Sequence, residues 1–268
     1  MIGFNFLGKM GQLGNQMFQY ASLKGIARNN NYNFCIPNHR EVVIDSLGNK
    51  LRIEIFQPFV LKNLSELNLQ TIDESRPLVQ ESGFYFNEDI FDECPDWVNL
   101  VGYFQTEKYF KHIEDEIRED FAFKDEILKP CKEMVSQVND PISLHIRRGD
   151  FLINSSNHHN LGLDYYKEAL RQFDSDKTVI IFSDDPDWCK EQSLFSDDRF
   201  LVSESNNSYV DLCLMSLCKE HIIANSTFSW WGAWLSTSKK VIAPKVWFGP
   251  SNAHLDTKDL YCPDWIVI

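Results

Sequence analysis

The second half of the chain alternates short apolar runs with segments of helical periodicity, and this alternation restricts the possible fold more than any other feature. Strands are predicted at residues 142–147, 178–185, 199–204, 221–226 and 239–247. Helices are predicted between them, at 163–173, from Pro186, at 208–220 and at 228–236. Because consecutive parallel strands need a crossover connection, the pattern predicts an α/β fold in which helices cover both faces of a parallel sheet.

The first half starts with the same pattern and then becomes less regular. Its expected elements are a strand at 2–7, a helix at 14–28, loops and short strands through 40–100, a strand at 98–105 and a charged amphipathic helix at 107–121. The sequence Asn139-Asp140-Pro141 is a turn signal between the two halves. We therefore expect two domains, residues 1–140 and 141–268, as Rossmann-like units that face each other across a cleft.

Charge and composition limit the partners. The net charge of −13 argues against nucleic acid or an anionic membrane surface as the main partner. There is no apolar run of about eighteen residues or more, the length that spans a membrane, and no signal peptide is visible. We expect a cytoplasmic protein with no transmembrane segment, and leave peripheral membrane contact open. The 7 scattered cysteines contain no C-x-x-C pair, which favours buried free thiols over disulfides or a zinc site.

Polar segments follow several of the predicted strands, and ligands bind at that edge of open α/β sheets. The first is the glycine-rich stretch from Gly8 to Gln16, which includes Gly11, Gly14 and Asn15. Glycines between a strand and a helix let the backbone approach an anion, and the helix start offers N–H groups. A purely structural turn is an equally good interpretation of this stretch.

The second segment is His145-Ile146-Arg147-Arg148-Gly149-Asp150. Side chains alternate along a strand, so His145 and Arg147 are expected on the same face. A guanidinium group keeps its charge at neutral pH and forms two parallel hydrogen bonds with a diphosphate. The structural alternative is a strand end at which Arg148 pairs with Asp150.

The third segment, Asn225 to Gly232, takes the chain from a strand into a helix. Its first turn contains Ser226, Thr227 and Phe228, whose hydroxyl and N–H groups suit an anion. An ordinary helix cap is the alternative. The tryptophans at 230, 231 and 234 are expected to pack against the sheet.

The fourth segment, Ser183 to Asp187, ends a strand with three carboxylates. Asp185 and Asp187 form a D-x-D, which in some glycosyltransferases holds a divalent metal. Carboxylates equally accept hydrogen bonds from a ribose or a guanine. Asp184 or Asp185 is also expected to cap the following helix, with Pro186 in its first turn.

Together these segments resemble the α-1,2-fucosyltransferases, glycosyltransferase family 11. The matching stretches are G-Q-L-G-N-Q-M-F-Q-Y, H-I-R-R-G-D, D-Y-Y-K-E-A-L, F-S-D-D and A-N-S-T-F-S-W-W-G-A-W, in the family's order. They extend from Gly8 to about Pro244. The chain departs from the family before D-Y-Y, where His158-His159-Asn160-Leu161-Gly162 replaces a His-Gly pair. This departure leaves acceptor preference open.

The resemblance implies the two-domain GT-B architecture, GDP-β-L-fucose as donor, inversion at the anomeric carbon and no metal or other cofactor. Residues 1–140 would then be the acceptor-side domain and residues 141–268 the domain that binds the GDP-sugar. The implied acceptor is an oligosaccharide, with a terminal β-galactose that receives fucose on its 2-hydroxyl.

The resemblance also implies roles for individual residues. Arg147, together with His145, would hold the diphosphate, and Asp184 would lie near the nucleoside. The base that deprotonates the acceptor is left open between Asp150 and His145. Donor-binding roles fall to Gly11, Gly14, Asn15, Arg148, Asp184, Ser226, Thr227 and Phe228.

Two other functions stay open. One is a metal-dependent nucleotide-sugar transferase with a different donor, which would use Asp185 and Asp187. The other is a protein of the same fold that binds glycans without catalysis.

Overall fold

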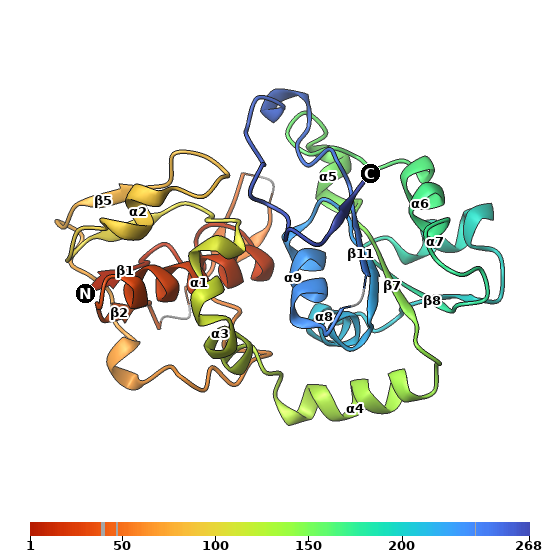
Figure 1. Ribbon diagram of the computed structural model, residues 1–268, viewed down its shortest axis with the longest axis horizontal. Helices are drawn as coiled ribbons and strands as arrows, with labels where there is room; N and C mark the ends of the chain where they lie inside the picture. The colour runs from red at the N-terminus through yellow and green to blue at the C-terminus, as the bar shows by residue number, and fades with distance from the viewer. Residues whose placement is uncertain (39–40, 47, 239) are drawn as a thin grey trace. The chain divides into compact units, whose positions relative to one another are not determined.

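The computed structural model describes residues 1–38, 41–46, 48–238 and 240–268. They form two compact units, which are described separately: unit 1 comprises residues 1–122 and 256–262, and unit 2 comprises residues 123–255 and 263–268 (Figure 1). The structural division thus follows Ala122, whereas the sequence places a boundary after Asp140. The assignment of acceptor and donor roles to the two halves, and a cleft between them, stay predictions.

Unit 2 contains a parallel sheet with the strand order β12–β11–β10–β7–β8–β9. Its strands are β7 (Ile142–Ile146), β8 (Val179–Ser183), β9 (Phe200–Val202), β10 (Glu220–Ile222), β11 (Lys240–Ala243) and β12 (Ile266–Val267). All residues of β7 are buried, as expected for a central strand covered on both faces. The α/β fold with a parallel sheet is confirmed.

Helices cover both faces of this sheet. Figure 1 shows α6 (Leu163–Leu170) and α7 (Pro186–Glu191) on one face, and α8 (Ser208–Leu217) and α9 (Thr227–Leu235) on the other. The chain proceeds from β7 through β8 to β9 in one direction and then returns to place β10 on the other side of β7. Strand order therefore reverses between β7 and β10, and in open α/β sheets ligands bind at that switch point.

Two helices of unit 2 are absent from the sequence prediction. They are α4 (Asp125–Ser136) and the short α5 (Gly149–Ile153). Helix α4 packs against α8 even though Pro130 lies inside it. The predicted strand at 239–247 corresponds to β11, but its first residue, 239, lies outside the described residues, as do residues 40 and 47 of the irregular region.

Unit 1 contains a smaller parallel sheet with the strand order β2–β1–β6–β5. Its strands are β1 (Ile2–Gly3), β2 (Phe34–Cys35), β5 (Leu78–Gln80) and β6 (Asn99–Val101), and β3 (Val43–Ile44) pairs antiparallel with β4 (Lys50–Leu51). Its helices are α1 (Leu13–Asn29), α2 (Glu88–Asp92) and α3 (Glu114–Asp120). The strand predicted at 2–7 ends early, because the Leu7 N–H donates to the Phe4 carbonyl in a turn.

The helix predicted at 107–121 is broken into two 3₁₀ turns, Glu107–Tyr109 and Lys111–Ile113, followed by α3. Tyr109 and Phe110 are adjacent and both fully buried. A Cβ at Gly25 of α1 would stand 2.0 Å from the Tyr109 carbonyl oxygen, so the two backbones are in close contact there. We attribute the break to this packing, which the charge pattern of the segment does not reveal. Further 3₁₀ turns occur at Glu66–Asn68, Ser193–Phe195 and Pro250–Asn252.

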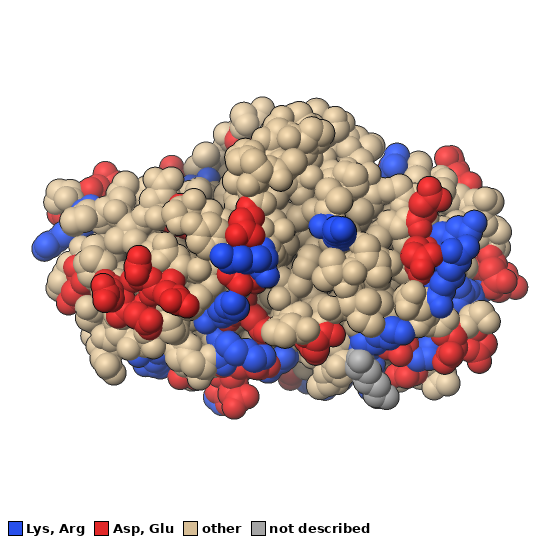
Figure 2. Space-filling view, turned by 45° about the horizontal axis from the view of Figure 1, so that its top comes forward, with Lys and Arg blue, Asp and Glu red and all other residues tan. Residues whose placement is uncertain are grey.

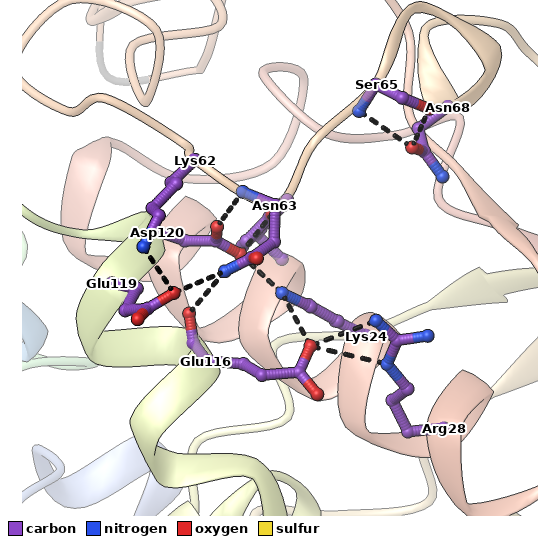
Figure 3. A network of polar contacts seen from close by, with 10 residues as sticks. Lys24, Arg28, Lys62, Asn63, Ser65, Asn68, Glu116, Glu119 and Asp120 are labelled. Carbon is purple, nitrogen blue, oxygen red and sulfur yellow. Dashed lines mark hydrogen bonds and ion pairs between the residues drawn. The ribbon is translucent and has the colours of Figure 1, made fainter.

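A buried ion pair joins α1 to α3. Lys24 Nζ lies 2.6 Å from Asp120 Oδ2, and both side chains are 0% exposed (Figure 3). The Tyr20 hydroxyl donates to the same carboxylate at 2.8 Å, and the Asn63 N–H donates to its other oxygen at 2.7 Å. Glu116 links this network to the surface, 3.2 Å from Lys24. Because Asp120 of α3 accepts from two side chains of α1 and from the Asn63 N–H, it holds these two helices and the loop around Asn63 together.

Candidate active site

The carboxyl edge of the unit 2 sheet brings together three of the four polar segments singled out in the sequence. Arg147 and Arg148 follow β7, Asp184 follows β8, and the start of α9 follows β10. The pairing of His145 in β7 with Phe182 in β8 places the ends of these strands side by side. The His145 ring lies 5.7 Å from the Phe228 ring of α9, which connects the second segment to the third.

Arg147 is held between two carboxylates. Its Nη2 lies 2.6 Å from Asp150 Oδ1 and its Nη1 lies 2.8 Å from Asp184 Oδ2. The side chain remains 22% exposed, so the guanidinium group is fixed and still reachable. The salt bridge considered in the sequence, between Arg148 and Asp150, is wrong: Asp150 pairs with Arg147.

Arg148 is held differently. Its Nε lies 2.9 Å from Asp185 Oδ2, and its guanidinium carbon lies 3.9 Å from the centre of the Trp188 ring. Its backbone N–H donates to Asp184 Oδ1 at 2.9 Å. No local pattern singles out Trp188, because the residue lies in helix α7, a separate element. The ring and the carboxylate fix the plane of the guanidinium group.

Gly149 is required by the close approach of Asp184. A Cβ at this position would stand 2.5 Å from Asp184 Oδ2, the oxygen that Arg147 contacts. The glycine of the H-I-R-R-G-D segment therefore lets one carboxylate reach both Arg147 and the Arg148 backbone. Two guanidinium groups face three carboxylates here, so a bound diphosphate must displace a carboxylate or draw on other donors.

The start of α9 supplies such donors. Ser226 is its N-cap residue, and its side chain makes no capping bond. Ser226, Thr227 and Phe228 are all partly exposed, and the first N–H groups of an α-helix have no partner within the helix. The positive end of the helix dipole adds to their attraction for an anion. Trp230, Trp231 and Trp234 in the same helix are buried, as expected for core residues, and their packing against the sheet stays a prediction.

His145 is buried and carries no charge at neutral pH. Burial, and to a smaller extent the neighbouring positive charge of Arg147, lower its pKa to about 3. Its Nδ1 is buried without a hydrogen-bond partner among the residues that the structure describes. A histidine with this pKa is a weak base for an acceptor hydroxyl, which favours Asp150 over His145 among the two residues left open by the sequence.

His158 is a neighbour that the sequence did not identify as part of the site. Its ring stacks on Phe151, with centres 4.1 Å apart and planes 8° apart. Burial lowers its pKa, the Asp150 charge raises it, and the Arg147 charge lowers it. Only the departure from the family pattern at residues 158–162 pointed to this loop.

Of the two carboxylates of the D-x-D, Asp185 is engaged by other partners and Asp187 is exposed. Asp185 Oδ1 accepts from the Trp188 N–H at 3.3 Å, which confirms the predicted cap, with Pro186 in the first turn of α7. Its other oxygen pairs with Arg148. Asp187 is 92% exposed and lies 3.9 Å from Lys190. A metal held by Asp185 and Asp187 would have to break the cap or the Arg148 pair.

The glycine-rich loop lies in unit 1, whereas the residues described so far lie in unit 2. Gly8 and Gly11 have φ values of +82° and +77°, which favour glycine. Glu54 Oε2 accepts from the Leu13 N–H at 3.0 Å and so occupies the first N–H of α1. Gly14 is buried, and the Asn15 side chain accepts a hydrogen bond from Gln105 at 2.9 Å. These contacts describe a structural turn, and a role in donor binding stays a prediction.

Glu81 follows β5 at the carboxyl edge of the unit 1 sheet and was missed in the sequence. Its Oε2 accepts from the Tyr103 and Phe104 N–H groups at 2.7 and 2.9 Å. Burial raises its pKa to about 7, although these two hydrogen bonds favour the charged form. No local signal identifies this residue, because its partners lie more than twenty positions away in the sequence.

The raised pKa of Glu81 predicts a pH-dependent stability. The folded state favours the protonated carboxyl, so a charged Glu81 destabilises the fold. This destabilisation is absent below the ordinary pKa of 4.5, grows between pH 4.5 and 7, and reaches its full size above pH 7. A difference of this size corresponds to about 3 kcal/mol. The variant Glu81→Gln should therefore gain stability relative to the wild type as pH rises from 5 to 8. Chemical unfolding at several pH values measures this gain, and a constant difference would contradict it.

Surface and cysteine features agree with the sequence. On the face that Figure 2 draws, lysine and arginine side chains stand in small groups beside aspartates and glutamates. All seven cysteines are buried and free, as predicted. None of the helices in the described part of the chain combines the length and apolar character that a membrane crossing needs.

Comparison with known proteins gives the family. The model of glycosyl transferase family 11 matches residues 2–268. The alpha-1,2-colitosyltransferase of Escherichia coli is 31% identical, over 96% of this chain and 96% of that protein. The galactoside alpha-(1,2)-fucosyltransferase 1 of Sus scrofa is 22% identical, over 96% of this chain and 73% of that protein.

The fold is also found among solved structures. A mutant of Arabidopsis thaliana FUT1 in complex with GDP superposes with a TM-score of 0.56 at 11% identity, over 90% of this chain and 69% of that one. At this identity the likeness concerns the fold alone. The family match extends over both units and includes every polar segment discussed above. The chain is a glycosyltransferase and belongs to glycosyl transferase family 11.

Proposed function

We propose that the protein transfers L-fucose from GDP-β-L-fucose to the 2-hydroxyl of a terminal β-galactose on an oligosaccharide, with inversion at the anomeric carbon. The observation that carries this proposal is the Arg147 guanidinium group, which two carboxylates hold in place at the switch point of the unit 2 sheet, where α9 also begins. Family membership and the name of the Sus scrofa relative support the donor and the linkage.

The chemistry requires stabilisation of a leaving diphosphate. When the bond between fucose and GDP breaks, negative charge builds on the β-phosphate. Arg147 and the N–H groups of Thr227 and Phe228 are donors already in place for that charge, so no reorganisation is needed as it develops. A divalent metal is unnecessary for this role, and we propose a metal-independent reaction.

Inversion in a single displacement also requires a base for the acceptor hydroxyl. Asp150 is bound to Arg147 in the free protein, 2.6 Å from Nη2. A phosphate oxygen that takes this place on the guanidinium group releases the carboxylate. We propose that donor binding in this way frees Asp150 to accept the proton, so that the base becomes available only when the donor is present.

A second donor deserves a test. The Escherichia coli relative with 31% identity is named an alpha-1,2-colitosyltransferase. Colitose lacks one hydroxyl of fucose. A pocket that makes no hydrogen bond to that hydroxyl discriminates only weakly between the two sugars, whereas a pocket that hydrogen-bonds it favours fucose. The linkage would be the same for either donor.

The donor assignment is tested by calorimetric titration with GDP, GDP-fucose, GDP-colitose and UDP, with EDTA present. We expect GDP and at least one GDP-sugar to bind, and UDP not to bind. Binding of UDP alone, or binding that appears only when manganese replaces EDTA, would contradict the proposal and favour a role for Asp185 and Asp187. Glycan binding without any response to GDP would favour a non-catalytic protein.

A further inference from the structure

The carboxyl edge of the unit 1 sheet carries a second group of polar side chains. It consists of Asn15 and Gln19 in α1, Glu81 after β5 and Gln105 after β6, and we call it the unit 1 polar cluster. Asn15 and Gln19 are four residues apart on one helix and therefore share a face. Gln19 donates to the Gly102 carbonyl at 3.1 Å, and Gln105 donates to Asn15 at 2.9 Å.

Three side-chain oxygens of this cluster have no hydrogen-bond donor. They are Oε1 of Gln19, Glu81 and Gln105, each buried and unpaired among the described residues. The opposite atom of each side chain is engaged: Nε2 of both glutamines donates, and Glu81 Oε2 accepts twice. The orientation of each side chain is thus fixed by its bonded end, and its free end is an acceptor, in Glu81 as long as the carboxyl carries no proton.

An unsatisfied buried acceptor is costly, about 1–3 kcal/mol for each group. Native structures contain few such groups, and three in one cluster indicate that donors are supplied from outside the chain. A ligand that matches must present several O–H or N–H donors close together. Sugar hydroxyl groups have this property, because neighbouring ring carbons each carry one.

Aromatic rings lie beside the cluster. Phe84 and Tyr103 are stacked, with centres 5.9 Å apart and planes 16° apart, and both are partly exposed. Tyr103 also gives its N–H to Glu81, so the ring and the carboxylate are fixed to one another. A sugar has polar edges and apolar C–H faces, and an aromatic ring next to hydrogen-bond acceptors suits both.

We propose that the unit 1 polar cluster binds hydroxyl groups of the acceptor glycan, with Glu81 Oε1 and Gln105 Oε1 as the accepting atoms. The inference rests on the proposed function, since it names the acceptor as the ligand. It adds a specificity-determining site in unit 1 to the donor site in unit 2. Neither Glu81 nor Gln105 belongs to the residues that the family resemblance assigns.

The charge of Glu81 gives the site a pH dependence. Its Oε2 is occupied by two N–H groups, so a proton on the carboxyl sits on Oε1 and turns that atom into a donor. The ionisable groups that interact with it are Tyr103 and Tyr109, whose pKa values are both raised by burial and by the Glu81 charge. The charge of Asp45 also acts on Tyr103. Acceptor binding should therefore strengthen as pH rises through about 7, when Glu81 loses its proton.

The test compares Glu81→Gln with the wild type. The glutamine keeps one oxygen for the Tyr103 and Phe104 N–H groups and places an NH₂ donor where Oε1 was. The expected result is an acceptor KM raised at least about tenfold, with the Kd for GDP unchanged, and the loss of the pH dependence of KM near 7. Glu74→Gln, at an exposed carboxylate of the same unit, controls for the change in charge.

A second variant, Gln105→Met, removes the other acceptor while preserving the length of the side chain. It should raise the acceptor KM in the same direction. Unfolding temperatures show whether both variants fold. If they fold and keep the acceptor KM within twofold of the wild type, the proposal is wrong, and internal water supplies the donors to the cluster.

Failure of the proposed function is distinguished by direct binding. Saturation-transfer NMR with methyl β-D-galactoside and lactose needs neither donor nor turnover. In one outcome the wild type does not bind GDP-fucose but gives a saturation-transfer signal with these glycans, and Glu81→Gln abolishes the signal. The donor assignment is then wrong, and glycan binding by the unit 1 polar cluster is supported. If the wild type transfers fucose to lactose while the glycan signal and the KM survive both substitutions, the cluster is refuted and the function stands.

Discussion

Replacement of Arg147 by alanine is expected to lower kcat about 10²- to 10³-fold, the range seen when one preorganised donor to a developing oxyanion is removed. The guanidinium group is held in place by Asp150 and Asp184 at 2.6 and 2.8 Å, and the β-phosphate can take the place of the Asp150 carboxylate on it. Steady-state release of GDP from GDP-fucose, with lactose as acceptor, measures the effect.

Two controls separate catalysis from folding. Arg171→Ala removes an exposed guanidinium group of unit 2 that pairs with Glu168 at the surface, and it should leave kcat unchanged. Arg147→Lys keeps the charge but loses the two-pronged geometry, so its kcat should lie between those of the wild type and Arg147→Ala. The diphosphate role of Arg147 would be refuted by a folded alanine variant whose turnover stays within a few-fold of the wild type.

Replacement of Asp120 by alanine is expected to lower the free energy of unfolding by about 3–5 kcal/mol, the usual cost of removing one partner of a buried ion pair. Lys24 would then be a buried charge without its main partner, since both side chains are 0% exposed in the wild type. The Tyr20 hydroxyl and the Asn63 N–H would lose their acceptor as well. Urea unfolding, followed by tryptophan fluorescence and circular dichroism, measures the loss.

The matched control lies on the neighbouring residue. Glu119 pairs with Lys62 at the surface, with the two side chains 50% and 62% exposed, and Glu119→Ala should leave the free energy of unfolding almost unchanged. The double variant Lys24→Met with Asp120→Ala removes the unpaired charge and should recover part of the loss. A cost for Asp120→Ala as small as that of Glu119→Ala would mean that the ion pair contributes little.

The sequence was informative where local patterns decide the structure. Apolar runs such as 178–185 became strands because a parallel sheet buries both of their faces. Asp185 and Pro186 start a helix as predicted, since capping depends on the few residues around it. The cluster of polar side chains around Arg147 followed from a general rule, that strand ends of a parallel sheet share one edge.

The features that were missed depend on contacts between distant residues. The apolar residues of helix α4 recur at helical spacing, but Pro130 inside it argues against a helix, and its packing on α8 shows that the helix forms. The break near Tyr109 arises from backbone contact with Gly25. Glu81 is an ordinary glutamate in its local sequence, and its importance appears only when Tyr103 and Phe104 donate to it.

The assignment of residues 256–262 to unit 1 has a consequence for the order in which the protein matures on the ribosome. Asp259 pairs with Lys108 at 2.6 Å and accepts from the Phe86 N–H at 2.9 Å, both within unit 1. These contacts cannot form until residues 123–255, which belong to unit 2, have been synthesised. Unit 1 therefore begins translation first but cannot be completed first, and a nascent chain stalled before Asp256 exposes the Lys108 and Phe86 surface to the cell.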